Sequence, residues 1–426
     1  MSKKWEEVKI KHLYNLTNGG TPKSDEPTYW EPKEIEWVTP EDLSTPGKKV
    51  NTVKRKISKL GLANSSATLI NRNSVAISTR APIGNPKLIL FQYSTNQGCK
   101  SMSPKQKSNS SPDYLYYFLS ASEGELKNLG RGTTFLELSN FALRNFKILN
   151  PSIEEQNCIV KFLDVKTSEI DTLIEDKEKL IALLEEKRQA IITEAVTKGL
   201  NPNVKMKDSG VEWIGEIPEH WDIEKMKYLF KIKKRIEGLE NPNILSVTQR
   251  GVKVKDISSN EGQLATSYDK YQTVEIGDFV MNHMDLLTGF IDISKFHGVT
   301  SPDYRVFSIK KPKFVKQYFL YYFQMNYSRR IFYKFGQGVA NFGRWRLPTD
   351  EFYNFYVPVP PAEEQKEIVE HISGRLLDIE SVIEKTKETI GKLKEYRQSL
   401  IYEAVTGKID VQEMLEETEQ EEVSLL

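Results

Sequence analysis

Residues 151–200, PSIEEQNCIVKFLDVKTSEIDTLIEDKEKLIALLEEKRQAIITEAVTKGL, are repeated as residues 360–409, PPAEEQKEIVEHISGRLLDIESVIEKTKETIGKLKEYRQSLIYEAVTGKI. The two stretches align without a gap at an offset of 209 residues, and 19 of the 50 aligned positions are identical. An ungapped repeat of this length indicates an internal duplication, and a duplication has to be settled before any fold is assigned.

Both copies of the repeat carry mostly apolar residues spaced alternately by four and three positions. In the second copy these residues are Ile372, Leu376, Ile379, Ile383, Thr386, Ile390, Leu393, Arg397 and Leu400. In the first copy they are Leu163, Thr167, Ile170, Ile174, Lys177, Ile181, Leu184, Arg188 and Ile191. A period of 3.5 residues predicts long helices that pair through a coiled-coil seam. About 45 helical residues span roughly 65 Å. We expect the two helices to pair with each other, and the alternative is two solvated helices of a larger bundle.

Length and composition favour a soluble protein of two or three domains. The chain has 426 residues, of which 38% are hydrophobic and 28% charged, as in ordinary globular proteins. No apolar run approaches the roughly 20 residues that span a membrane, and the start, MSKKWEEVKIKH, lacks the apolar segment of a secretory signal. Only Cys99 and Cys158 occur, which excludes a disulfide framework and favours the cytoplasm.

The overall net charge of +1 conceals an alternation along the chain. Residues 1–150 carry a net charge of +9, residues 151–200 carry −4, residues 201–359 carry +5, and residues 360–426 carry −9. Basic domains are typical of proteins that bind polyanions such as nucleic acid. The acidic helices are expected to contact protein rather than phosphate.

The first globular segment predicts strands, a helix and turns in one mixed domain. Residues 74–78 and 87–91 are strand-like and flank a Pro-Gly turn at 82–84, and residues 113–119 predict an aromatic-rich helix. Ser152 with Glu155 forms a capping-box pattern at the start of the first long helix. Gly199 is expected to end that helix.

The second globular segment repeats the pattern of the first. Trp5 and the following strand pattern are echoed from Trp221, and the aromatic helix is echoed at 318–323. We therefore predict an α+β fold in which two mixed α/β domains are separated by two long antiparallel coiled-coil helices, with pseudo-two-fold internal symmetry. The predicted parts are a first domain (1–150), a central helix (151–200), a linker and second domain (201–359), a C-terminal helix (360–410) and an acidic tail expected to be disordered (411–426).

The sequence offers little that is typical of a catalytic site. It contains neither a Walker A motif nor the Asn/Asp-Pro-Pro-aromatic motif of amino-methyltransferases. Asp113 and Glu125-Leu126-Lys127 loosely match a metal-dependent nuclease, but such carboxylates must converge on a metal from adjacent strands, and these lie along a predicted helix. The five histidines are scattered, and neither cysteine lies near one at zinc-ligand spacing. We therefore predict no catalytic residue and no metal site in this chain.

A DNA-binding interpretation fits the duplicated domains better. Two similar domains at a fixed separation suit two half-sites on a duplex, and sequence readout uses Arg, Lys, Asn and Gln side chains that enter a groove. Candidates in the first domain are Arg80, Asn96, Gln97, Lys100, Arg131, Thr133 and Thr134. Candidates in the second domain are Gln249, Arg250, Asn282, His283, Arg305, Gln337, Asn341, Arg344 and Arg346.

With these repeats and motifs, the chain resembles the specificity subunit of type I restriction–modification systems over nearly its whole length. The motifs that carry the resemblance are PSIEEQ (151–156), PPAEEQ (360–365), DSGVEWIGEIPEHW (208–221), STRAPIG (78–84), TNQGCK (95–100), NHMD (282–285), SPDYR (301–305) and FGRWRL (342–347). Ser152-Ile153 departs from the Pro-Leu that is usual in the family.

The resemblance implies a non-catalytic subunit with two target-recognition domains, which binds a bipartite, asymmetric site on double-stranded DNA. It also implies that two modification subunits dock along the helices and methylate adenine N6 after base flipping, and that restriction subunits complete an ATP-dependent nuclease. S-adenosylmethionine, ATP and Mg²⁺ are then expected in those partners and not in this chain. The expected docking residues at the helix starts are Glu154, Glu155, Gln156, Glu363, Glu364 and Gln365.

Two other functions remain open from the sequence. The chain could be a coiled-coil scaffold whose basic domains bind proteins or anionic surfaces without reading DNA sequence. It could also be a nuclease or methyltransferase acting in one chain, in which case the purified chain would turn over substrate with a metal or cofactor.

Overall fold

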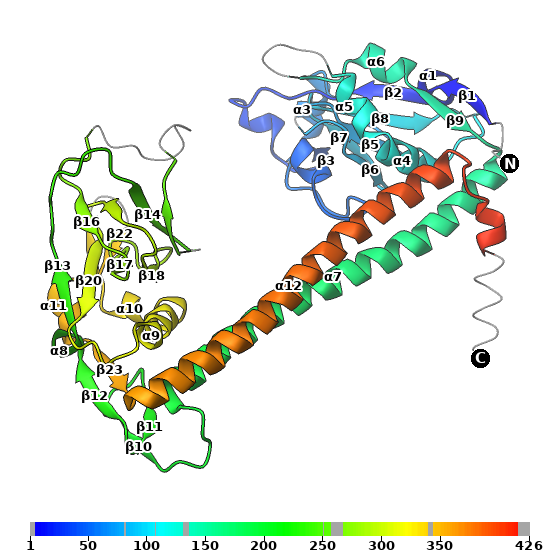
Figure 1. Cartoon of the computed structure of the whole chain (residues 1–426). Coiled ribbons are helices and arrows are strands. Elements are labelled where there is room, and N and C mark those ends of the chain that lie inside the picture. The colour runs from blue at the N-terminus through cyan, green and yellow to red at the C-terminus, as the bar shows by residue number, and fades with distance from the viewer. Residues whose placement is uncertain are drawn as a thin grey trace. The chain divides into compact units, whose positions relative to one another are not determined.

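The chain folds into two compact units, shown in the computed structural model of Figure 1. The structure describes residues 5–80, 82–106, 108–130, 136–249, 251–256, 267–339 and 344–415. One unit consists of Met1–Lys177 with Lys387–Leu426, and the other of Glu178–Thr386. Each unit therefore contains one globular domain together with a part of each long helix.

The first domain is built on three antiparallel or mixed sheets. The central sheet has the order β2-β8-β5-β6 and is antiparallel throughout, with β2 (Tyr14–Asn18), β8 (Cys99–Pro104), β5 (Ser74–Ser78) and β6 (Pro86–Ile89). A second sheet has the order β4-β3-β7, with β4 (Lys56–Ile57), β3 (Ile35–Val38) and β7 (Tyr93–Thr95), and β1 (Glu6–Lys9) pairs with β9 (Lys147–Asn150). The helices are α1 (Ile10–Leu13), α2 (Pro40–Leu43), α3 (Lys59–Ala63), α4 (Pro112–Ala121), α5 (Glu123–Asn128) and α6 (Asn140–Asn145), with a 3-10 turn at Pro27–Tyr29.

The second domain repeats the central sheet and adds its own strands. Its sheet β13-β20-β17-β18 contains β13 (Phe230–Lys233), β20 (Arg305–Ile309), β17 (Phe279–Met281) and β18 (Ile291–Ile293). A second sheet, β15-β14-β19-β16, contains β15 (Gly251–Val254), β14 (Ile244–Thr248), β19 (Gly298–Thr300) and β16 (Gln272–Val274). The strand pairs are β12 (Asp222–Lys225) with β23 (Tyr356–Val359), β10 (Met206–Asp208) with β11 (Glu216–Pro218), and β21 (Gln337–Val339) with β22 (Arg344–Arg346). The helices are α8 (Met226–Leu229), α9 (Lys316–Ser328), α10 (Ile331–Lys334) and α11 (Thr349–Asn354).

The repeated order of elements confirms the predicted duplication of the domains. The series β1-α1-β2 of the first domain corresponds to β12-α8-β13 of the second, and α4 corresponds to α9. The strand predicted at 74–78, the helix predicted at 113–119 and the turn at Gly84, whose φ is +93°, are all present. The α+β fold class is confirmed.

The duplicated segments form two long helices, as predicted. Helix α7 runs from Ile153 to Lys198 and α12 from Ala362 to Val405. The capping box is present, because the Ser152 Oγ atom accepts from the Glu155 amide and Glu155 accepts from the Ser152 amide. Gly199 follows the last residue of α7 with a φ of +75°, a value that favours glycine.

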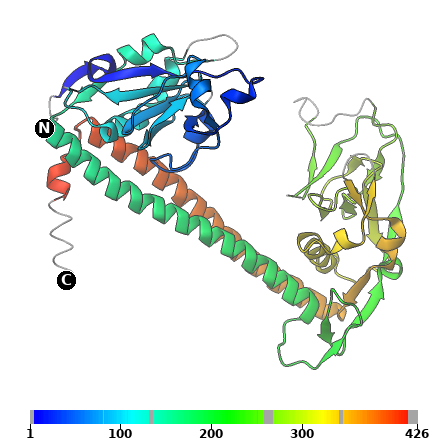
Figure 2. The same cartoon turned by 180° about the vertical axis from the view of Figure 1, so that it is seen from behind.

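The two helices pair in antiparallel fashion within each unit, which can be followed from behind in Figure 2. In the first unit, Arg397 of α12 forms two hydrogen bonds to the carboxylate of Asp171 in α7, at 2.8 and 3.1 Å. The seam residues predicted from the 3.5-residue period are all buried or half-buried, so the predicted seam is confirmed.

None of the described helices is long and apolar enough to cross a membrane.

One tyrosine in each domain joins the aromatic helix to the paired helices. Tyr114 Oη, from α4, lies 3.0 Å from the carbonyl oxygen of Leu149 and 3.1 Å from that of Val405 at the end of α12. Tyr318 Oη, from α9, lies 3.1 Å from the carbonyl oxygen of Val196, near the end of α7, and from that of Pro358. Burial raises the pKa of both phenols far above their usual value, so both stay neutral donors. Helix α4 thus lies between the central sheet and the helix pair (Figure 1).

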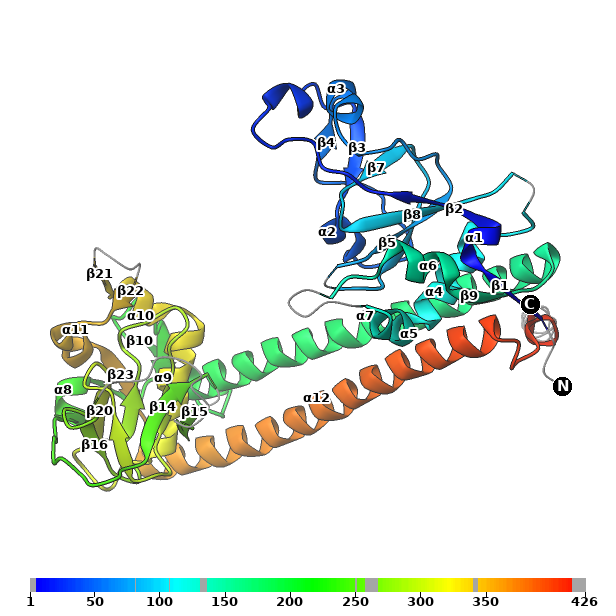
Figure 3. The same ribbon diagram turned by 90° about the horizontal axis from the view of Figure 1, so that it is seen from above.

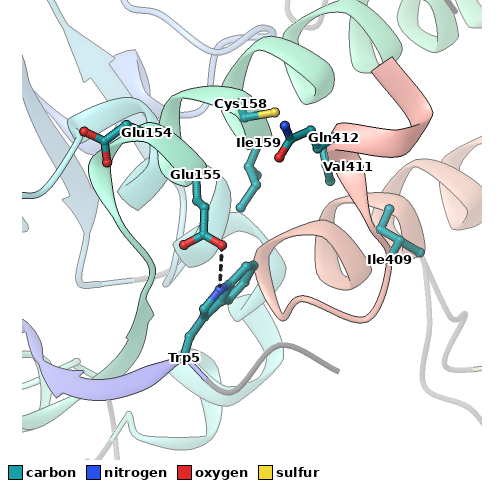
Figure 4. Close-up of a pocket in the computed structure, with 8 residues that line it drawn as sticks. All are labelled: Trp5, Glu154, Glu155, Cys158, Ile159, Ile409, Val411 and Gln412. Carbon is teal, nitrogen blue, oxygen red and sulfur yellow. Dashed lines mark hydrogen bonds between the residues drawn. The ribbon is translucent and has the colours of Figure 1, made fainter. Parts of the chain in front are cut away.

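The acidic tail is partly ordered, contrary to the prediction of disorder over 411–426. Residues 411–415 form a helical turn, and Val411 is buried beside Ile159 of α7 in a pocket that Trp5 also lines (Figure 4). An apolar residue at the first position of the acidic stretch explains this contact, because it gains from burial while the acidic residues after it stay in water. Residues 416–426 lie outside the described residues.

Candidate nucleic-acid interface

Three distant segments of the first domain meet beyond the end of β5. The Thr79 carbonyl oxygen accepts from the Leu138 amide at 2.9 Å, and the Thr79 amide donates to the Gly98 carbonyl at 2.8 Å. This brings the candidate residues Arg80, Asn96, Gln97 and Lys100 into one region. Gln97 is exposed at the tip of a turn, and the Asn96 side chain accepts from the Gly98 amide at 2.9 Å. Arg80 and Gln97 are therefore the candidates in this cluster that present side chains to solvent.

The cations of this cluster are paired with one carboxylate, Glu137. Glu137 lies 3.1 Å from Arg80 Nε and 3.8 Å from Lys100 Nζ. Lys100 is buried and donates to the Leu138 carbonyl at 3.1 Å, and burial lowers the pKa of its ammonium group. The prediction that Lys100 contacts DNA is therefore corrected, because its amine is used inside the domain.

In the second domain, a β-hairpin carries two of the candidates on an exposed surface. Strands β21 and β22 pair with Gln337 opposite Arg346, and both residues are exposed. Figure 3 shows the hairpin projecting from the edge of its domain. The Trp345 ring, from the middle of β22, stacks on the Tyr333 ring with 5.1 Å between the ring centres, and its Nε1 atom donates to the Tyr333 carbonyl at 2.6 Å. A Cβ atom at Gly336 would lie 2.1 Å from this indole, so only glycine at position 336 allows the Trp345 ring to pack against the backbone.

Two further candidates, His283 and Arg305, lie behind the hairpin and are 5% and 4% exposed. The Leu347 amide donates to the His283 carbonyl at 2.9 Å, and Arg305 Nη2 donates to the Leu347 carbonyl at 3.1 Å. The Arg305 guanidinium also lies 4.5 Å from the centre of the Phe352 ring, a cation–π contact. Burial, with Arg305 and Arg346 nearby, lowers the pKa of His283 to about 3, so the imidazole is neutral.

The prediction that His283 and Arg305 read DNA bases directly is corrected by this burial. Both side chains face the interior of the domain and support the hairpin from behind. Asn282 is half-buried, and its carbonyl oxygen accepts from Tyr327 Oη at 2.8 Å. Gln249 is exposed in the turn that follows β14. Of the candidates whose side chains are described in this domain, Gln249, Gln337 and Arg346 are exposed.

Some candidates lie outside the described residues. These are Arg131, Thr133, Thr134, Arg250 and Asn341. Arg344 belongs to strand β22, but its side chain is not described. The assignment of these residues as DNA-contacting residues stays a prediction.

The expected docking residues at the helix starts contact their own chain. Gln156 and Gln365 are fully buried. Gln156 Oε1 accepts from the Ser111 amide at 2.8 Å, and Gln365 Oε1 accepts from the Val315 amide at 2.9 Å, so each glutamine caps the start of its domain's aromatic helix. Their assignment as docking residues is wrong, because no partner can reach a buried side chain.

Two of the four glutamates are engaged in the same junctions. Trp5 Nε1 donates to Glu155 at 3.4 Å (Figure 4), and Trp221 Nε1 donates to Glu364 at 3.0 Å. Glu154 and Glu363 are the more exposed members of the two pairs, although Glu363 also accepts from Lys366. A docking role for these four glutamates stays a prediction.

Sequence reasoning missed Glu137 and Trp345, which organise the two clusters. A signal was present for Glu137, because Leu138 and Leu347 are separated by the same 209 residues as the helices. The residues that precede them, Glu137 and Arg346, are therefore equivalent. Among the described residues, no group of three or more His, Cys, Asp or Glu side chains could hold a metal ion.

Comparison with known proteins identifies the family. The model of the type I restriction modification DNA specificity domain matches residues 2–183 and 218–391. The chain is 30% identical over 319 residues to the MjaVIII specificity subunit of Methanocaldococcus jannaschii, covering 71% of each chain. It is also 30% identical over 238 residues to the MjaIX specificity subunit of the same organism, covering 54% of this chain and 52% of that relative, which is about half its length.

Solved structures share the fold at low sequence identity. A chain from a structure titled as the basis of complex assembly and conformational transition of the type I R-M system has a TM-score of 0.69 at 14% identity, covering 95% of this chain and 98% of that one. The HsdS subunit from Thermoanaerobacter tengcongensis has a TM-score of 0.52 at 15% identity, covering 95% and 97%. Because the family model covers well over half of the chain, we conclude that the chain belongs to the family of type I restriction–modification specificity subunits.

Proposed function

We propose that the two domains of this specificity subunit each read one half of a bipartite, asymmetric site on double-stranded DNA. The observation that carries the proposal is that one duplicated framework exposes different polar side chains in its two copies. In the first domain, Arg80 pairs with Glu137 and Gln97 is exposed on the neighbouring turn; in the second, Gln337 and Arg346, the equivalent of Glu137, are exposed on the β21–β22 hairpin. A shared framework with different reading residues suits two half-sites of different sequence.

The exposed hairpin of the second domain has the dimensions and chemistry for groove readout. The major groove of B-DNA admits a two-stranded β-ribbon, and a glutamine side chain on such a ribbon can pair with adenine. Gln337 and Arg346 lie side by side across β21 and β22. Trp345 holds the hairpin to the domain, so the two side chains are positioned before DNA binds.

The proposal includes partner subunits that dock on the helices and perform the chemistry. On α7, Val165 and Leu173 are exposed apolar residues on one face, with a shallow groove between them. Exposed apolar patches mark interaction sites more often than solvated surface, so we assign this face to a modification subunit. Adenine methylation with S-adenosylmethionine, and ATP- and Mg²⁺-dependent cleavage by restriction subunits, then belong to the partners. Because the substrate is cellular DNA, the proposal includes a cytoplasmic location.

Selection of duplexes by the assembled methyltransferase tests the reading function. A random duplex pool should yield one split consensus with two different half-sites and an unspecified spacer. Sequence-independent binding, or no binding in the presence of modification subunits, would favour the scaffold function instead.

A second experiment tests whether the helices set the length of the spacer. Inserting one heptad at matched positions of both helices preserves the seam and adds about 10 Å of helix. This corresponds to about 3 base pairs at 3.4 Å each, so the selected spacer should lengthen by about that amount. A control with the heptad in α7 alone should disrupt assembly, and an unchanged spacer in the double insertion would contradict the role of the helices.

A further inference from the structure

The two domains contain the same buried cation motif at the edge of the central sheet. Lys100 is the second residue of β8 and lies opposite Ile77 of β5, and Arg305 is the first residue of β20 and lies opposite Met281 of β17. Each cation donates at 3.1 Å to the carbonyl oxygen of a buried leucine, Leu138 or Leu347. Lys100 and Arg305 are therefore equivalent residues of the duplicated framework.

The residue before each leucine has opposite charge in the two copies. In the first domain it is Glu137, whose carboxylate lies 3.8 Å from Lys100 Nζ and 3.1 Å from Arg80 Nε. In the second domain it is Arg346, which lowers the pKa of both Arg305 and His283 by its positive charge, although burial is the larger cause for each. The charge of the first cluster is thus partly neutralised by its own carboxylate, whereas the second cluster gains a further positive charge.

The second cluster has two polar atoms without a hydrogen-bond partner among the residues that the structure describes. Arg305 Nη1 and His283 Nδ1 are covered from solvent and have no hydrogen-bond partner. Among the residues that the structure describes, no carboxylate pairs with Arg305 or Arg346. A buried cation without a counter-charge is destabilising, and buried donors without partners add to that cost. An anion with several acceptor oxygens would supply the counter-charge.

We propose that Arg305, Arg346 and His283 form a phosphate-binding site in the second domain, in which a bound phosphate takes the place that the Glu137 carboxylate holds in the first. A phosphate group matches the fork of guanidinium donors that exposed Arg346 presents, and buried Arg305 and His283 lie behind it. Arg346 is exposed and meets the phosphate directly. The charge of Arg305 strengthens the attraction from behind, because little water screens a buried charge.

The source of the phosphate rests on the proposed function, which supplies the DNA backbone. In that case Arg346 anchors the β21–β22 hairpin to a phosphate, and Gln337 on the opposite strand is left to face a base. Phosphate contacts fix the position of a reading element without carrying sequence information. The site assigns Arg346 to positioning and separates it from base readout.

Unfolding of the full-length chain in phosphate tests the site without DNA. We compare potassium phosphate with potassium chloride at equal ionic strength and pH. At a phosphate concentration of ten times its Kd, the midpoint temperature of unfolding of the second unit should be about 3–5 °C higher in phosphate than in chloride. Arg346→Glu copies the internal carboxylate of the first domain and should abolish this response. Arg329→Glu, an exposed charge reversal in the same domain, is the matched control for the general stabilising effect of phosphate.

The reciprocal substitution makes the test independent of a folding defect in one variant. Glu137→Arg copies the second domain into the first and should give the first unit a phosphate response that it lacks in the wild type. If Arg346→Glu responds to phosphate as strongly as Arg329→Glu does, or if Glu137→Arg gains no response, there is no phosphate site.

Binding of duplex DNA by the assembled methyltransferase tests the source of the phosphate. Arg346→Glu should weaken target and non-target duplexes by the same factor and lower the slope of log K against log salt by about 0.9. A changed sequence preference would overturn the phosphate role in favour of base reading. If Arg346→Glu loses the phosphate response but binds DNA as the wild type does, DNA is not the source of the phosphate. If the wild type does not bind DNA, the proposed function is contradicted, and the unfolding experiment alone then decides whether the phosphate site exists.

Discussion

Replacement of the buried glutamine at the start of each long helix distinguishes a framework role from a docking role. In Gln365→Leu, the side chain keeps a similar size but loses both polar ends. The Val315 amide then lacks its acceptor at 2.9 Å, and the Pro360 carbonyl lacks its donor at 2.9 Å. Gln156→Leu removes the equivalent acceptor of the Ser111 amide.

The expected cost follows from the number of groups left without partners. Each buried backbone group that loses its hydrogen bond costs about 1–3 kcal/mol, and Gln365→Leu leaves two such groups. Leucine regains part of this by burying apolar surface. We expect the second unit to lose about 2–5 kcal/mol of unfolding free energy. A loss of 2 kcal/mol corresponds to about 30-fold in the opening equilibrium.

Hydrogen exchange and chemical unfolding of the isolated chain measure this loss. The peptide that contains Val315 should exchange about 30-fold faster or more in Gln365→Leu, since its amide no longer has an acceptor. Lys366→Leu, one residue along and exposed, is the matched control and should leave the exchange rate of this peptide unchanged. The framework role is refuted if Gln365→Leu unfolds within about 0.5 kcal/mol of the wild type yet no longer binds a modification subunit.

Three other substitutions address the helix end, the docking face and the buried histidine. Gly199→Ala and Gly210→Ala share the strain of a positive φ, +75° and +69°, but only at Gly199 would the new Cβ atom lie 3.2 Å from Trp221. Gly210→Ala should therefore lower the unfolding free energy by about 1 kcal/mol and Gly199→Ala by more. Equal melting temperatures of the two variants would contradict the role of the Trp221 contact. Leu173→Asp should weaken binding of a modification subunit at least tenfold in a pull-down titration without altering unfolding, whereas Leu60→Asp, equally exposed on the first domain, should do neither. The pKa of His283 is about 3 in the folded chain, below its ordinary 6.5, so the unfolded chain binds one more proton than the folded chain between these values. The stability that His283 contributes should be fully present above pH 6.5, and below pH 6.5 it should decrease by at most about 1.4 kcal/mol per pH unit. A His283→Gln variant whose stability has the same pH profile as the wild type would disprove this cause.

The sequence was sufficient where a local pattern determines the structure. The 3.5-residue period predicted the seam of α7 and α12, and the Ser152–Glu155 pattern predicted the cap, because both depend on residues within one or two turns of each other. The strand at 74–78 and the aromatic helix at 113–119 were predictable for the same reason.

The roles of the polar residues were predicted less well, because burial depends on partners far along the chain. Gln156 lies in an acidic stretch that suggests a surface, yet Ser111, 45 residues earlier, makes it a buried cap. Arg305 lies in a basic segment that suggests DNA contact, yet Leu347, 42 residues later, accepts its hydrogen bond. Residue type and charge pattern locate such residues near a functional region, but not on its surface.

Net charge also fails to locate the site, and the duplicated framework explains why. The first domain, residues 1–150, carries +9 and the second segment, residues 201–359, only +5, so net charge alone would assign the stronger phosphate contact to the first. In the first domain, however, the Glu137 carboxylate already forms ion pairs with Arg80 and Lys100 at the sheet edge. In the second, Arg346 stands at the equivalent position, and no carboxylate of the described residues pairs with Arg346 or Arg305. The charge available to a phosphate is therefore set by one residue of the framework, and that residue differs between the two copies.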